Sequence, residues 1–387
     1  MGISALQIYH LLPFRMKEWV ASLRGAQLKR WRFGPQSDRL IGEALLREHW
    51  SFEELESWEK ARLAVLLDHA ARNVPYYRKF WEKDLQRGGN HAPWLELSNW
   101  PVLEKMELRR NNMQFLQEGA DPSRMFEEHT SGTTSTPLHV WWSREAVQLT
   151  YAVFEARVRL WNGVSRHSRW AVMGGQLIIP VERRKPPFWV WNSSLNQLYL
   201  SSYHLAPDLI PHYLEALVKH RVEYIFGYSS SLYALAQGIL ASGRKDLRMR
   251  VALTNAEPLF EYQRSAISEA FRCPVRETYG NSEGVSHASE CGAGKRHFWP
   301  ELGAVEVLEG MNPVPDGAVG DLVFTGIFNP MMPLIRYRIG DRGSIRKGVR
   351  CECGRTLPIL ETVEGRKDDI LVTPDGRLIG RLDPIFK

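Results

Sequence analysis

Short apolar segments alternate with helix-like segments between residues 169 and 284, and this alternation limits the folds open to the chain. Each apolar segment has the length of a strand and ends in glycine or polar turn residues. The expected strands lie near 169–173, at 222–228 and at the beginnings of 250–258 and 275–284; the expected helices lie at 208–220, 231–242 and 260–271. Strands that alternate with helices favour an α/β fold with a substantially parallel sheet.

Further elements flank this region. Residues 52–72 carry apolar side chains on one helical face, Pro75 ends that segment, and another helix is expected at 144–160. From about residue 300 the segments LGAVEVL, DLVFTGI and GSIRK, separated by glycine and proline turns, predict short strands. A length of 387 residues indicates two or three domains. We predict an N-terminal helical region packed on the core (1–115), an α/β core (116–300) and a smaller β-rich subdomain (301–367).

Composition excludes several classes of protein. Hydrophobic residues make up 44% of the chain and charged residues 24%, which is typical of a soluble globular protein. No apolar run reaches the length of a membrane-spanning helix, and the N-terminus lacks the pattern of a signal peptide. Four cysteines in so long a chain argue against a disulfide scaffold, so we expect a cytoplasmic protein. The net charge of +6 suits anionic ligands, but the basic residues are too scattered for nucleic-acid binding.

Residues 1–33 are the exception, because basic and apolar side chains are interleaved there. The basic residues are Arg15, Lys17, Arg24, Lys29, Arg30 and Arg32, and the apolar ones include Leu11, Leu12, Phe14, Trp19, Val20 and Leu23. Such a segment lies on an anionic membrane surface in some proteins and packs on the body of the protein in others. We keep both interpretations, the first of which implies a peripheral position at the inner face of the membrane.

The stretch HTSGTTSTPLHVWW (129–142) has the composition of a phosphate-binding loop. Backbone N–H groups near a glycine and hydroxyl side chains are suitable donors to phosphate oxygens. The candidate donors are five consecutive residues, which we name the phosphate loop: Thr130, Ser131, Gly132, Thr133 and Thr134. It is not a Walker loop, because the Gly-Lys-Ser/Thr ending is absent. The structural alternative is an ordinary turn rich in serine and threonine.

Two further polar loops, TNAEP (254–258) and ETYGNSEG (277–284), each follow an expected strand. Ligands of parallel sheets bind beyond the carboxyl ends of the strands, so we expect these loops and the phosphate loop to converge. Glu283 offers a carboxylate for Mg²⁺ on a triphosphate, and Tyr279 offers a ring for stacking.

Three residues near the C-terminus complete this set. Asp341 is a candidate acceptor for ribose hydroxyls, and Arg338 and Arg366 are candidates for contact with phosphate or ribose. Structural alternatives for the whole set are a capping glutamate, a core tyrosine, a turn aspartate and surface arginines.

A second group of residues is a candidate lining for a substrate pocket. His129 precedes the phosphate loop, and the others follow expected strands: Gly174, Gly175, Tyr228 and Ser229. The alternatives are a pocket or core histidine for His129, and a strand end followed by a helix N-terminus for the segment FGYSSS.

Three cysteines and one histidine have the chemistry of a structural zinc site. Cys291, His297, Cys351 and Cys353 supply three thiolates and one imidazole, a tetrahedral zinc set. The alternative is a set of ordinary thiols and a surface histidine. The fourth cysteine, Cys273, is expected in the core.

The order of these motifs resembles that of the adenylate-forming enzymes. The chain contains SGTT, AEP, YGxSE, YRxGD and GRxDD in succession, and it is most similar to phenylacetate–CoA ligase-like proteins, especially the branch found in capsule and exopolysaccharide gene clusters. Further stretches resemble that branch, namely RNVPYYRKF, LSSYHL, FGYSSSLYALA and GRLDPIFK. The resemblance covers nearly the whole chain, and its five ordered motifs are specific at the level of the family.

The resemblance implies a reaction and a cofactor set. A carboxylic acid or amino acid attacks the α-phosphate of ATP, giving an acyl-adenylate and pyrophosphate, and a thiol (such as that of coenzyme A), amine or hydroxyl then takes the acyl group. The large N-terminal domain of this fold carries the site, Mg²⁺ assists, and some relatives hold a structural zinc.

Residue roles carry over position by position. The phosphate loop holds the β- and γ-phosphates, Glu283 holds Mg²⁺, and Asp341 holds the ribose. Thr130, Glu283 and Arg338 are the expected catalytic residues. The adenine is lined by Asn255, Ala256 and Glu257, and Tyr279 stacks on it. Gly280 and Arg366 also belong to the expected nucleotide-binding residues.

Two features depart from the family pattern. Ser135 and Thr136 stand where relatives have glycine followed by lysine or threonine, which puts the rate of turnover in doubt. Asp368 resembles the hinge before a small C-terminal domain, so we expect 368–387 to be the hinge and the beginning of a truncated domain without its catalytic lysine. The alternatives are therefore an acid-activating enzyme of polysaccharide biosynthesis, an aryl- or acyl-CoA ligase, and a non-catalytic nucleotide-binding or scaffold protein.

Overall fold

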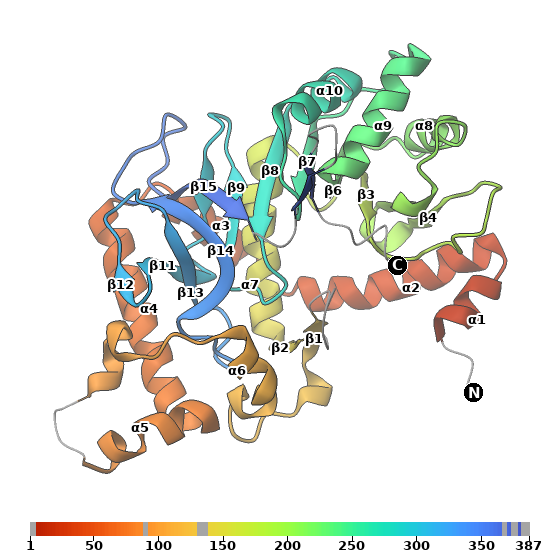
Figure 1. Cartoon of the computed structure of the whole chain (residues 1–387). Helices are drawn as coiled ribbons and strands as arrows, with labels where there is room; N and C mark the ends of the chain where they lie inside the picture. Colours follow the sequence, from red (N-terminus) through yellow and green to blue (C-terminus); the bar gives the residue numbers. More distant parts are fainter. Residues whose placement is uncertain (1–4, 88–91, 130–137, 366–369, 373–377, 381–387) are drawn as a thin grey trace. The chain divides into compact units, whose positions relative to one another are not determined.

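A computed structural model describes residues 5–87, 92–129, 138–365, 370–372 and 378–380. The chain forms two compact units, each assembled from separate parts of the sequence (Figure 1). Unit 1 takes its described residues from Met1–Trp31, Val158–Thr278 and Asp369–Lys387, and unit 2 from Arg32–Arg157 and Tyr279–Asp368. The predicted boundaries at residues 115 and 300 both fall inside unit 2, because its helices and its sheet come from distant segments.

Unit 1 contains a largely parallel sheet. Its strands are β3 (Trp170–Gly174), β4 (Trp189–Asn192), β5 (Gln197–Ser201), β6 (Tyr224–Tyr228), β7 (Val251–Asn255) and β8 (Val275–Gly280). The order is β8-β7-β6-β3-β5-β4, and only β4 runs antiparallel to its neighbour. The predicted α/β fold is confirmed.

Three helices cover this sheet: α8 (Ile210–Lys219), α9 (Ser229–Ser242) and α10 (Glu261–Phe271). Figure 1 shows α9 and α10 beside each other, and both contact β7. Their inner faces form one apolar core with the strands, to which Met173, Ile225, Leu235 and Phe271 belong. Each helix lies within two residues of a predicted one, because its apolar spacing is local and strong. The unit also contains α1 (Ala5–Leu11), most of α2 (Phe14–Arg32) and the pair β16 (Ile370–Val372) and β17 (Leu378–Gly380).

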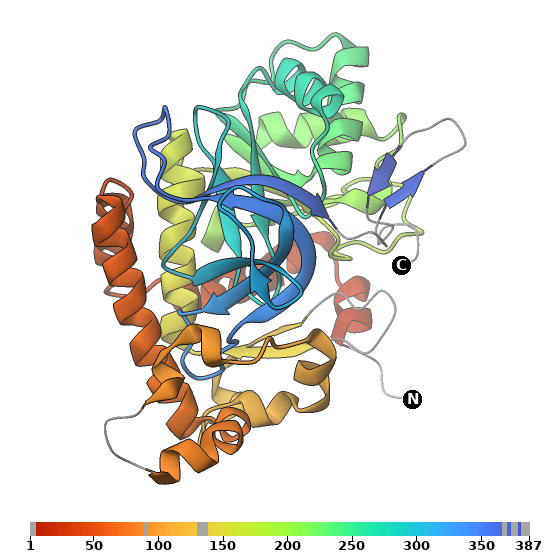
Figure 2. The same ribbon diagram turned by 60° about the vertical axis from the view of Figure 1, so that its left-hand side comes forward.

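Unit 2 contains an antiparallel sheet. Its strands are β9 (His287–Glu290), β10 (Arg296–Phe298), β11 (Gly303–Glu309), β12 (Asn312–Pro313), β13 (Gly320–Gly326), β14 (Tyr337–Arg346) and β15 (Ile359–Gly365), in the order β12-β11-β13-β14-β15-β10-β9. Register shifts interrupt β14 on both sides, and Figures 1 and 2 show this strand as strongly curved. A β-bulge bends a strand and increases its twist. A separate ladder pairs β1 (Phe126–His129) with β2 (His139–Trp142).

The helices of unit 2 are α3 (Ser37–Arg47), α4 (Phe52–Asn73), α5 (Pro75–Arg87), α6 (Lys105–Arg110) and α7 (Arg144–Phe154). Ser51 and Glu54 form a capping box at the start of α4. Pro75 stops α4, as predicted, and also begins α5, since the first position of a helix needs no N–H donor. Short helical turns lie at Pro93–Leu95, Leu97–Asn99, Asn112–Phe115, Pro122–Arg124, Glu155–Arg159, Leu160–Asn162, Ser193–Leu195 and Ser202–His204.

A buried ion cluster lies in the core of unit 2. The Glu301 carboxylate accepts two hydrogen bonds from Arg157, at 2.5 and 2.7 Å, and one from Arg47 at 2.7 Å. Arg157 has no exposed surface and Glu301 is 3% exposed. The cluster joins α3, the π-helical turn that follows α7, and the segment before β11. It therefore ties together three parts of the chain that are far apart in sequence.

The described helices were compared with the length and apolar character that a membrane-spanning helix needs. None of them combines the length needed to cross a bilayer with sufficient apolar character.

Candidate active site

The carboxyl ends of the parallel strands in unit 1 lie at one edge of the sheet. Tyr228, the last residue of β6, pairs with Asn255, the last residue of β7, and Thr254 pairs with Glu277 of β8. Thr278 also donates a hydrogen bond to the carbonyl of Thr254 at 2.8 Å. The loops TNAEP and ETYGNSEG therefore leave the sheet at the same edge, where ligands of parallel sheets bind.

The TNAEP turn has two features that are typical of a binding site. Ala256 has a φ of +63°, a left-handed conformation that is unfavourable for a residue with a Cβ and that concentrates at functional positions. Within the described residues, the buried Thr254 Oγ1 and Asn255 Oδ1 have no hydrogen-bond partner. Since buried polar atoms are almost always paired, these two atoms are suited to a polar ligand.

Glu257, which follows Ala256 in this turn, has a structural role in unit 1. Its carboxylate accepts hydrogen bonds from the backbone N–H of Ser230 at 2.8 Å and from the Ser230 hydroxyl at 3.0 Å. It thus lies at the N-terminus of α9, where the helix dipole favours a negative charge. Its side chain is 8% exposed. Because this carboxylate already binds Ser230, the backbone of the turn, and not the Glu257 side chain, is the candidate contact for the adenine.

Gly175 and Tyr228, two of the predicted pocket residues, lie close together in unit 1. A Cβ placed on Gly175 would be 3.1 Å from the Tyr228 hydroxyl, and one on Gly174 would be 3.2 Å from the Tyr199 hydroxyl. The Tyr203 hydroxyl donates to the carbonyl of Gly175 at 2.9 Å. These contacts place several tyrosine hydroxyls around the end of β3.

Ser229 differs from its neighbour Tyr228. It has no exposed surface, it begins α9, and its hydroxyl donates to the carbonyl of Glu257 at 3.4 Å. The alternative interpretation of FGYSSS, a strand end followed by a helix N-terminus, describes what Ser229 does here. Contact with a substrate remains a prediction for it.

Glu283 is held in a buried position in unit 2. The Tyr337 hydroxyl donates to Glu283 Oε1 at 2.8 Å, and the Lys105 ammonium lies 3.2 Å from the same oxygen. The Glu283 side chain is only 4% exposed. Sequence reasoning missed both partners. Tyr337 belongs to the YRxGD motif but carried no role, and Lys105 begins a short helix with no recognisable motif.

Gly284, which follows Glu283, has to be glycine for two reasons. Its φ is +79°, and a Cβ there would lie 2.3 Å from Trp142 Cζ2 and 2.8 Å from Phe328 Cζ. We expect Gly284→Ala to lower the free energy of unfolding by about 2–4 kcal/mol, because it adds backbone strain to overpacking. Urea denaturation measures this change. Gly42→Ala is the control, since that glycine lies in α3 and a Cβ added to it would meet no neighbouring atom within 4 Å. Equal stability of the two variants would contradict the expectation.

Tyr279 and Asp341 form a second pair in unit 2. The Tyr279 hydroxyl donates to Asp341 Oδ2 at 2.8 Å, although the residues are 62 positions apart. Asp341 lies where β14 changes register against β13, and the preceding Gly340 has a φ of +94°. A β-bulge disturbs the ordinary alternation of side chains along a strand. The structure thus brings together the predicted stacking ring and the predicted ribose acceptor.

Arg338 does not join these residues. Its guanidinium lies 2.7 Å from Glu104 and 3.6 Å from Asp321, and it donates to the carbonyl of Gly310 at 2.8 Å. Successive side chains of a strand point to opposite faces, and the preceding Tyr337 is the one that reaches Glu283. The structure thus shows Arg338 in a structural role, and its catalytic role stays a prediction.

His129 ends β1 and is exposed, so the alternative of a core histidine is wrong. Its register partner on β2 is His139, and the two rings are 6.4 Å apart. Exposure leaves its ring accessible to a ligand.

The phosphate loop and parts of the C-terminal segment lie outside the described residues, so their roles stay predictions. The predicted site and hinge residues concerned are Thr130, Ser131, Gly132, Thr133, Thr134, Arg366 and Asp368, and the two departures from the family pattern are Ser135 and Thr136. The described residues nearest the loop in sequence, His129 and Leu138, are in unit 2.

The cysteine cluster of unit 2 is closely assembled. The ligand atoms of Cys291, His297, Cys351 and Cys353 all lie within 4.8 Å of one another. The Cys291 and Cys351 sulfurs are 3.9 Å apart. Tetrahedral zinc with Zn–S bonds of ~2.3 Å requires sulfurs roughly 3.8 Å apart. The spacing therefore fits a zinc ion.

Two similar turns and a histidine orient these ligands. In each turn the cysteine N–H bonds to the carbonyl four residues on, Lys295 after Cys291 and Arg355 after Cys351. His297 has no exposed surface, so the alternative of a surface histidine is wrong. Its Nδ1 lies 3.1 Å from the carbonyl of Leu357, which leaves Nε2 for a metal, as is usual for zinc ligands. Cys273 is separate and buried, as predicted, and burial raises the pKa of its thiol to about 12.

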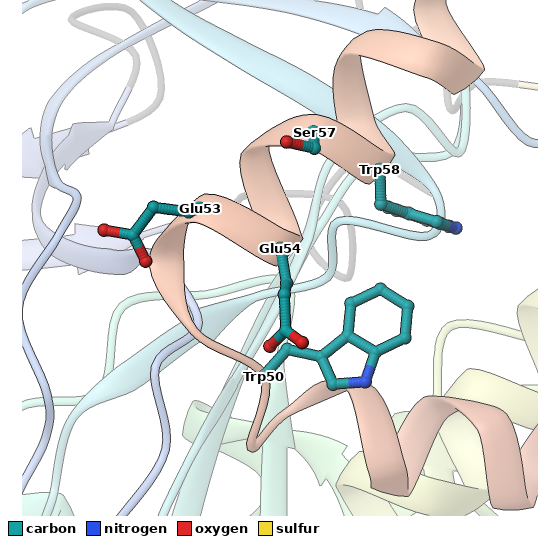
Figure 3. Close-up of a pocket in the computed structure, with 5 residues that line it drawn as sticks. All are labelled: Trp50, Glu53, Glu54, Ser57 and Trp58. Carbon is teal, nitrogen blue, oxygen red and sulfur yellow. The ribbon is translucent and has the colours of Figure 1, made fainter.

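A shallow pocket of about 460 Å³ lies elsewhere in unit 2, where α3 connects to α4 (Figure 3). It contains none of the predicted site residues. Its lining consists of Trp50, Glu53, Glu54, Ser57 and Trp58. Glu54 belongs to the capping box of α4, and the Arg47 guanidinium lies 4.3 Å from the centre of the Trp58 ring. Helix capping accounts for Glu54, and packing accounts for Trp50 and Trp58, without a ligand.

Comparison with curated proteins finds relatives along most of the chain. It is 25% identical to protein CapK of Staphylococcus aureus over 370 residues, which is 94% of this chain and 78% of CapK. It is 23% identical to the phenylacetate–coenzyme A ligase of Escherichia coli over 342 residues, which is 83% of this chain and 73% of that enzyme. These similarities fit the adenylate-forming, phenylacetate–CoA ligase-like family. The predicted resemblance is confirmed.

Solved structures agree on the fold. An open form of 2-hydroxyisobutyryl-CoA ligase, in complex with 2-HIB-AMP and CoA, matches with a TM-score of 0.62 and 20% identity over 86% of this chain and 79% of that one. No family model matches the sequence. The similarity to phenylacetate–coenzyme A ligases indicates an AMP-forming ligase, as predicted.

Proposed function

We propose that this ligase activates a small carboxylic acid or amino acid with ATP. A carboxylate oxygen of the acid forms a bond to the α-phosphorus, the bond to the pyrophosphate oxygen breaks, and pyrophosphate leaves with the electron pair. A thiol, amine or hydroxyl then displaces AMP from the acyl-adenylate. The observation that carries the proposal is the 2.8 Å hydrogen bond between Tyr279 and Asp341, which joins two distant motifs of the family.

Each proposed role follows from the chemistry of the side chain. Asp341 accepts hydrogen bonds from ribose hydroxyls, the Tyr279 ring stacks on the adenine, and the TNAEP backbone contacts the adenine as well. The phosphate loop and Arg366 donate to phosphate oxygens. Such a reaction depends on positioning and on stabilisation of charge, so fixed donors and a cation supply most of what it needs.

Magnesium is proposed as the cation, with Glu283 as its protein ligand. One carboxylate, phosphate oxygens and water are the usual ligands of Mg²⁺ on a nucleotide. Both present contacts of Glu283 use Oε1, and one comes from the positive Lys105. Two cations this close repel each other, so Lys105 has to move away when a metal occupies the carboxylate. When bound, the metal would neutralise phosphate charge.

Zinc is proposed as a structural ion held by Cys291, His297, Cys351 and Cys353. The spacing of the sulfurs, the 3.4 Å approach of His297 Nε2 to Cys353 Sγ and the paired turns support this assignment. The ion would join the turn after β9 to the turn before β15.

The biological setting is proposed from the relatives. The resemblance to the branch of capsule and exopolysaccharide gene clusters, together with similarity to CapK, supports activation of an acid for polysaccharide synthesis. Similarity to phenylacetate–coenzyme A ligases supports the other enzyme candidate, an aryl- or acyl-CoA ligase that uses coenzyme A as acceptor. Residues His129, Gly174, Gly175, Tyr228 and Ser229 are the proposed substrate contacts. Residues 1–33 are proposed to contact a membrane at its periphery.

Calorimetric titration of ATP with Mg²⁺ tests the nucleotide site without knowledge of the acid. We expect Asp341→Ala to raise the Kd about tenfold, because it removes a charged acceptor for ribose hydroxyls. The control is Asp246→Ala, whose carboxylate pairs with Arg244 on the surface and touches no motif. A Glu283→Ala variant tests the proposed Mg²⁺ ligand, and its binding should lose the dependence on Mg²⁺.

The possible outcomes separate the candidate functions. Equal affinity of the wild type and Asp341→Ala would remove this residue from the site. A folded, zinc-replete wild type that binds no ATP would favour the scaffold candidate. If ATP binds, acid-dependent exchange of labelled pyrophosphate into ATP identifies the acid, and acid-dependent consumption of the free coenzyme A thiol distinguishes the two enzyme candidates.

A further inference from the structure

Helix α2 carries its large apolar side chains on the exposed side. Met16, Trp19, Val20 and Leu23 follow the i, i+3, i+4, i+7 spacing of one helical face. Their exposed fractions are 50%, 74%, 41% and 68%, and Leu11, at the end of α1, is 81% exposed. We name these five residues the exposed stripe. Four of its members share one face of α2, whereas exposed apolar residues of soluble proteins are usually scattered.

The opposite side of α2 packs on the rest of unit 1 through small and polar groups. Lys17 and Gly25 are buried, and a Cβ on Gly25 would lie 2.2 Å from Asn192 Oδ1, so glycine is needed for this close approach. The Ser194 hydroxyl donates to the carbonyl of Ser22 at 2.8 Å. A helix of a soluble protein ordinarily buries its apolar face. Here the contacts with Asn192 and Ser194 hold the helix so that its apolar face points outward.

The charges on α2 are distributed in the same way. Its exposed charged residues are all basic, namely Arg15, Arg24, Lys29 and Arg30. The single acidic residue, Glu18, is half-buried, and the backbone N–H of Trp191 in unit 1 donates to it. Burial raises the pKa of Glu18 despite that hydrogen bond. An apolar stripe edged by cations is complementary to lipid that carries negative headgroups.

We propose that the exposed stripe inserts into the surface of an anionic bilayer and holds unit 1 there. This deepens the proposed membrane contact of residues 1–33, on which it rests, by naming the inserted side chains and the lipid charge. Trp19 suits this position, because indole rings favour the boundary between hydrocarbon and water. A second copy of the chain is a poorer partner. In a symmetric contact through α2, Arg15, Arg24 and Arg30 of one copy would lie close to the same three arginines of the other copy, and these positive charges would repel each other.

Sedimentation with vesicles tests the proposal on the full-length chain. The probes are vesicles of phosphatidylcholine alone and vesicles that also contain phosphatidylglycerol. We expect binding to the mixed vesicles only, and we expect Leu23→Gln to weaken it about tenfold because a buried leucine side chain is lost. Leu46→Gln is a matched control, since Leu46 also lies on a helix and is 69% exposed against 68% for Leu23. It should bind like the wild type.

Charge and fold are tested separately. Arg24→Gln should weaken binding to the mixed vesicles about fivefold. Trp19→Gln provides a second stripe variant, and thermal unfolding checks that both stripe variants remain folded. Equal binding to the two kinds of vesicle, or equal binding by Leu23→Gln and Leu46→Gln, would overturn the proposal. A dimer in the absence of lipid that Leu23→Gln dissociates would assign the stripe to a second copy and would also overturn it.

The proposed enzymatic function can fail independently. Vesicle binding needs neither ATP nor an acid, and none of the stripe residues belongs to the proposed nucleotide or substrate site. Leu23→Gln should therefore retain ATP binding. If the wild-type chain bound anionic vesicles but did not bind ATP, the ligase proposal would be contradicted and the membrane proposal would stand.

Discussion

Replacing Glu301 by alanine is expected to lower the free energy of unfolding by about 3–5 kcal/mol. The change leaves Arg47 and Arg157 charged in the core of unit 2, where they are 7% and 0% exposed, without the carboxylate that both of them contact. Removing one member of a buried ion cluster costs far more than removing a surface pair, because the remaining charges stay desolvated. Urea denaturation followed by circular dichroism measures the change.

Glu118→Ala is the matched control for this variant. Glu118 also pairs with an arginine, Arg78 at 2.7 Å, but its side chain is 65% exposed. Water screens such a pair, so no measurable change in stability is expected. If the two glutamate variants unfolded at the same urea concentration, the Glu301 cluster would not contribute to stability as predicted.

The same cluster predicts a dependence on pH. Burial alone would raise the pKa of Glu301, but the guanidinium groups of Arg157 and Arg47 outweigh it and hold the pKa below its ordinary value. A carboxylate with a lowered pKa stabilises the fold above the unfolded pKa, and that contribution disappears as the pH falls through the folded pKa. Acid should therefore destabilise the wild type more steeply than Glu301→Gln, which has no carboxylate to protonate.

Removal of the proposed zinc ion should have the second large effect. We expect one zinc ion per chain by elemental analysis, and we expect its loss in Cys291→Ser/Cys351→Ser to cost about 3 kcal/mol or more. Without the ion, the turns at Cys291 and Cys351 are joined only by weaker contacts. A strong chelator should lower the unfolding temperature of the wild type and leave that of the double variant unchanged.

Cys273→Ala is the control for the metal. This thiol is buried in unit 1 and is not a member of the cluster, so the variant should keep its zinc ion. Wild-type chain without zinc after preparation in zinc-containing buffer would contradict the assignment. So would a double variant that retains the metal.

Local elements could be predicted from the sequence, because their signals lie within a few residues. The apolar spacing of 52–72 predicted α4, and the short apolar runs predicted β3, β6, β7 and β8. Helix α5 was missed, because Pro75 was interpreted only as a stop, although proline also suits the first position of a helix. The strands β4 and β5 were missed as well, since the segment around them is rich in tryptophan and proline and shows no clear period.

The candidate site was partly predictable, because its motifs are also short and local in the sequence. Motif order identified Tyr279, Glu283 and Asp341, and the structure places two pairs of contacts around them. Lys105 could not be predicted as a partner of Glu283, because it belongs to no motif. Arg338 illustrates the converse, since its motif suggested catalysis whereas its side chain pairs with Glu104.

The sequence by itself determined the strongly periodic elements of this protein, its resemblance to a family and the residue types of its candidate site. Only the tertiary structure decided which distant side chains meet and which face of α2 is exposed. Arg47 contacts Glu301 across 254 positions, and the composition of residues 1–33 left open which side of the helix would pack. The physical reason is that periodicity and turn chemistry act over a few residues, whereas ion pairs and packing depend on how the whole chain closes on itself.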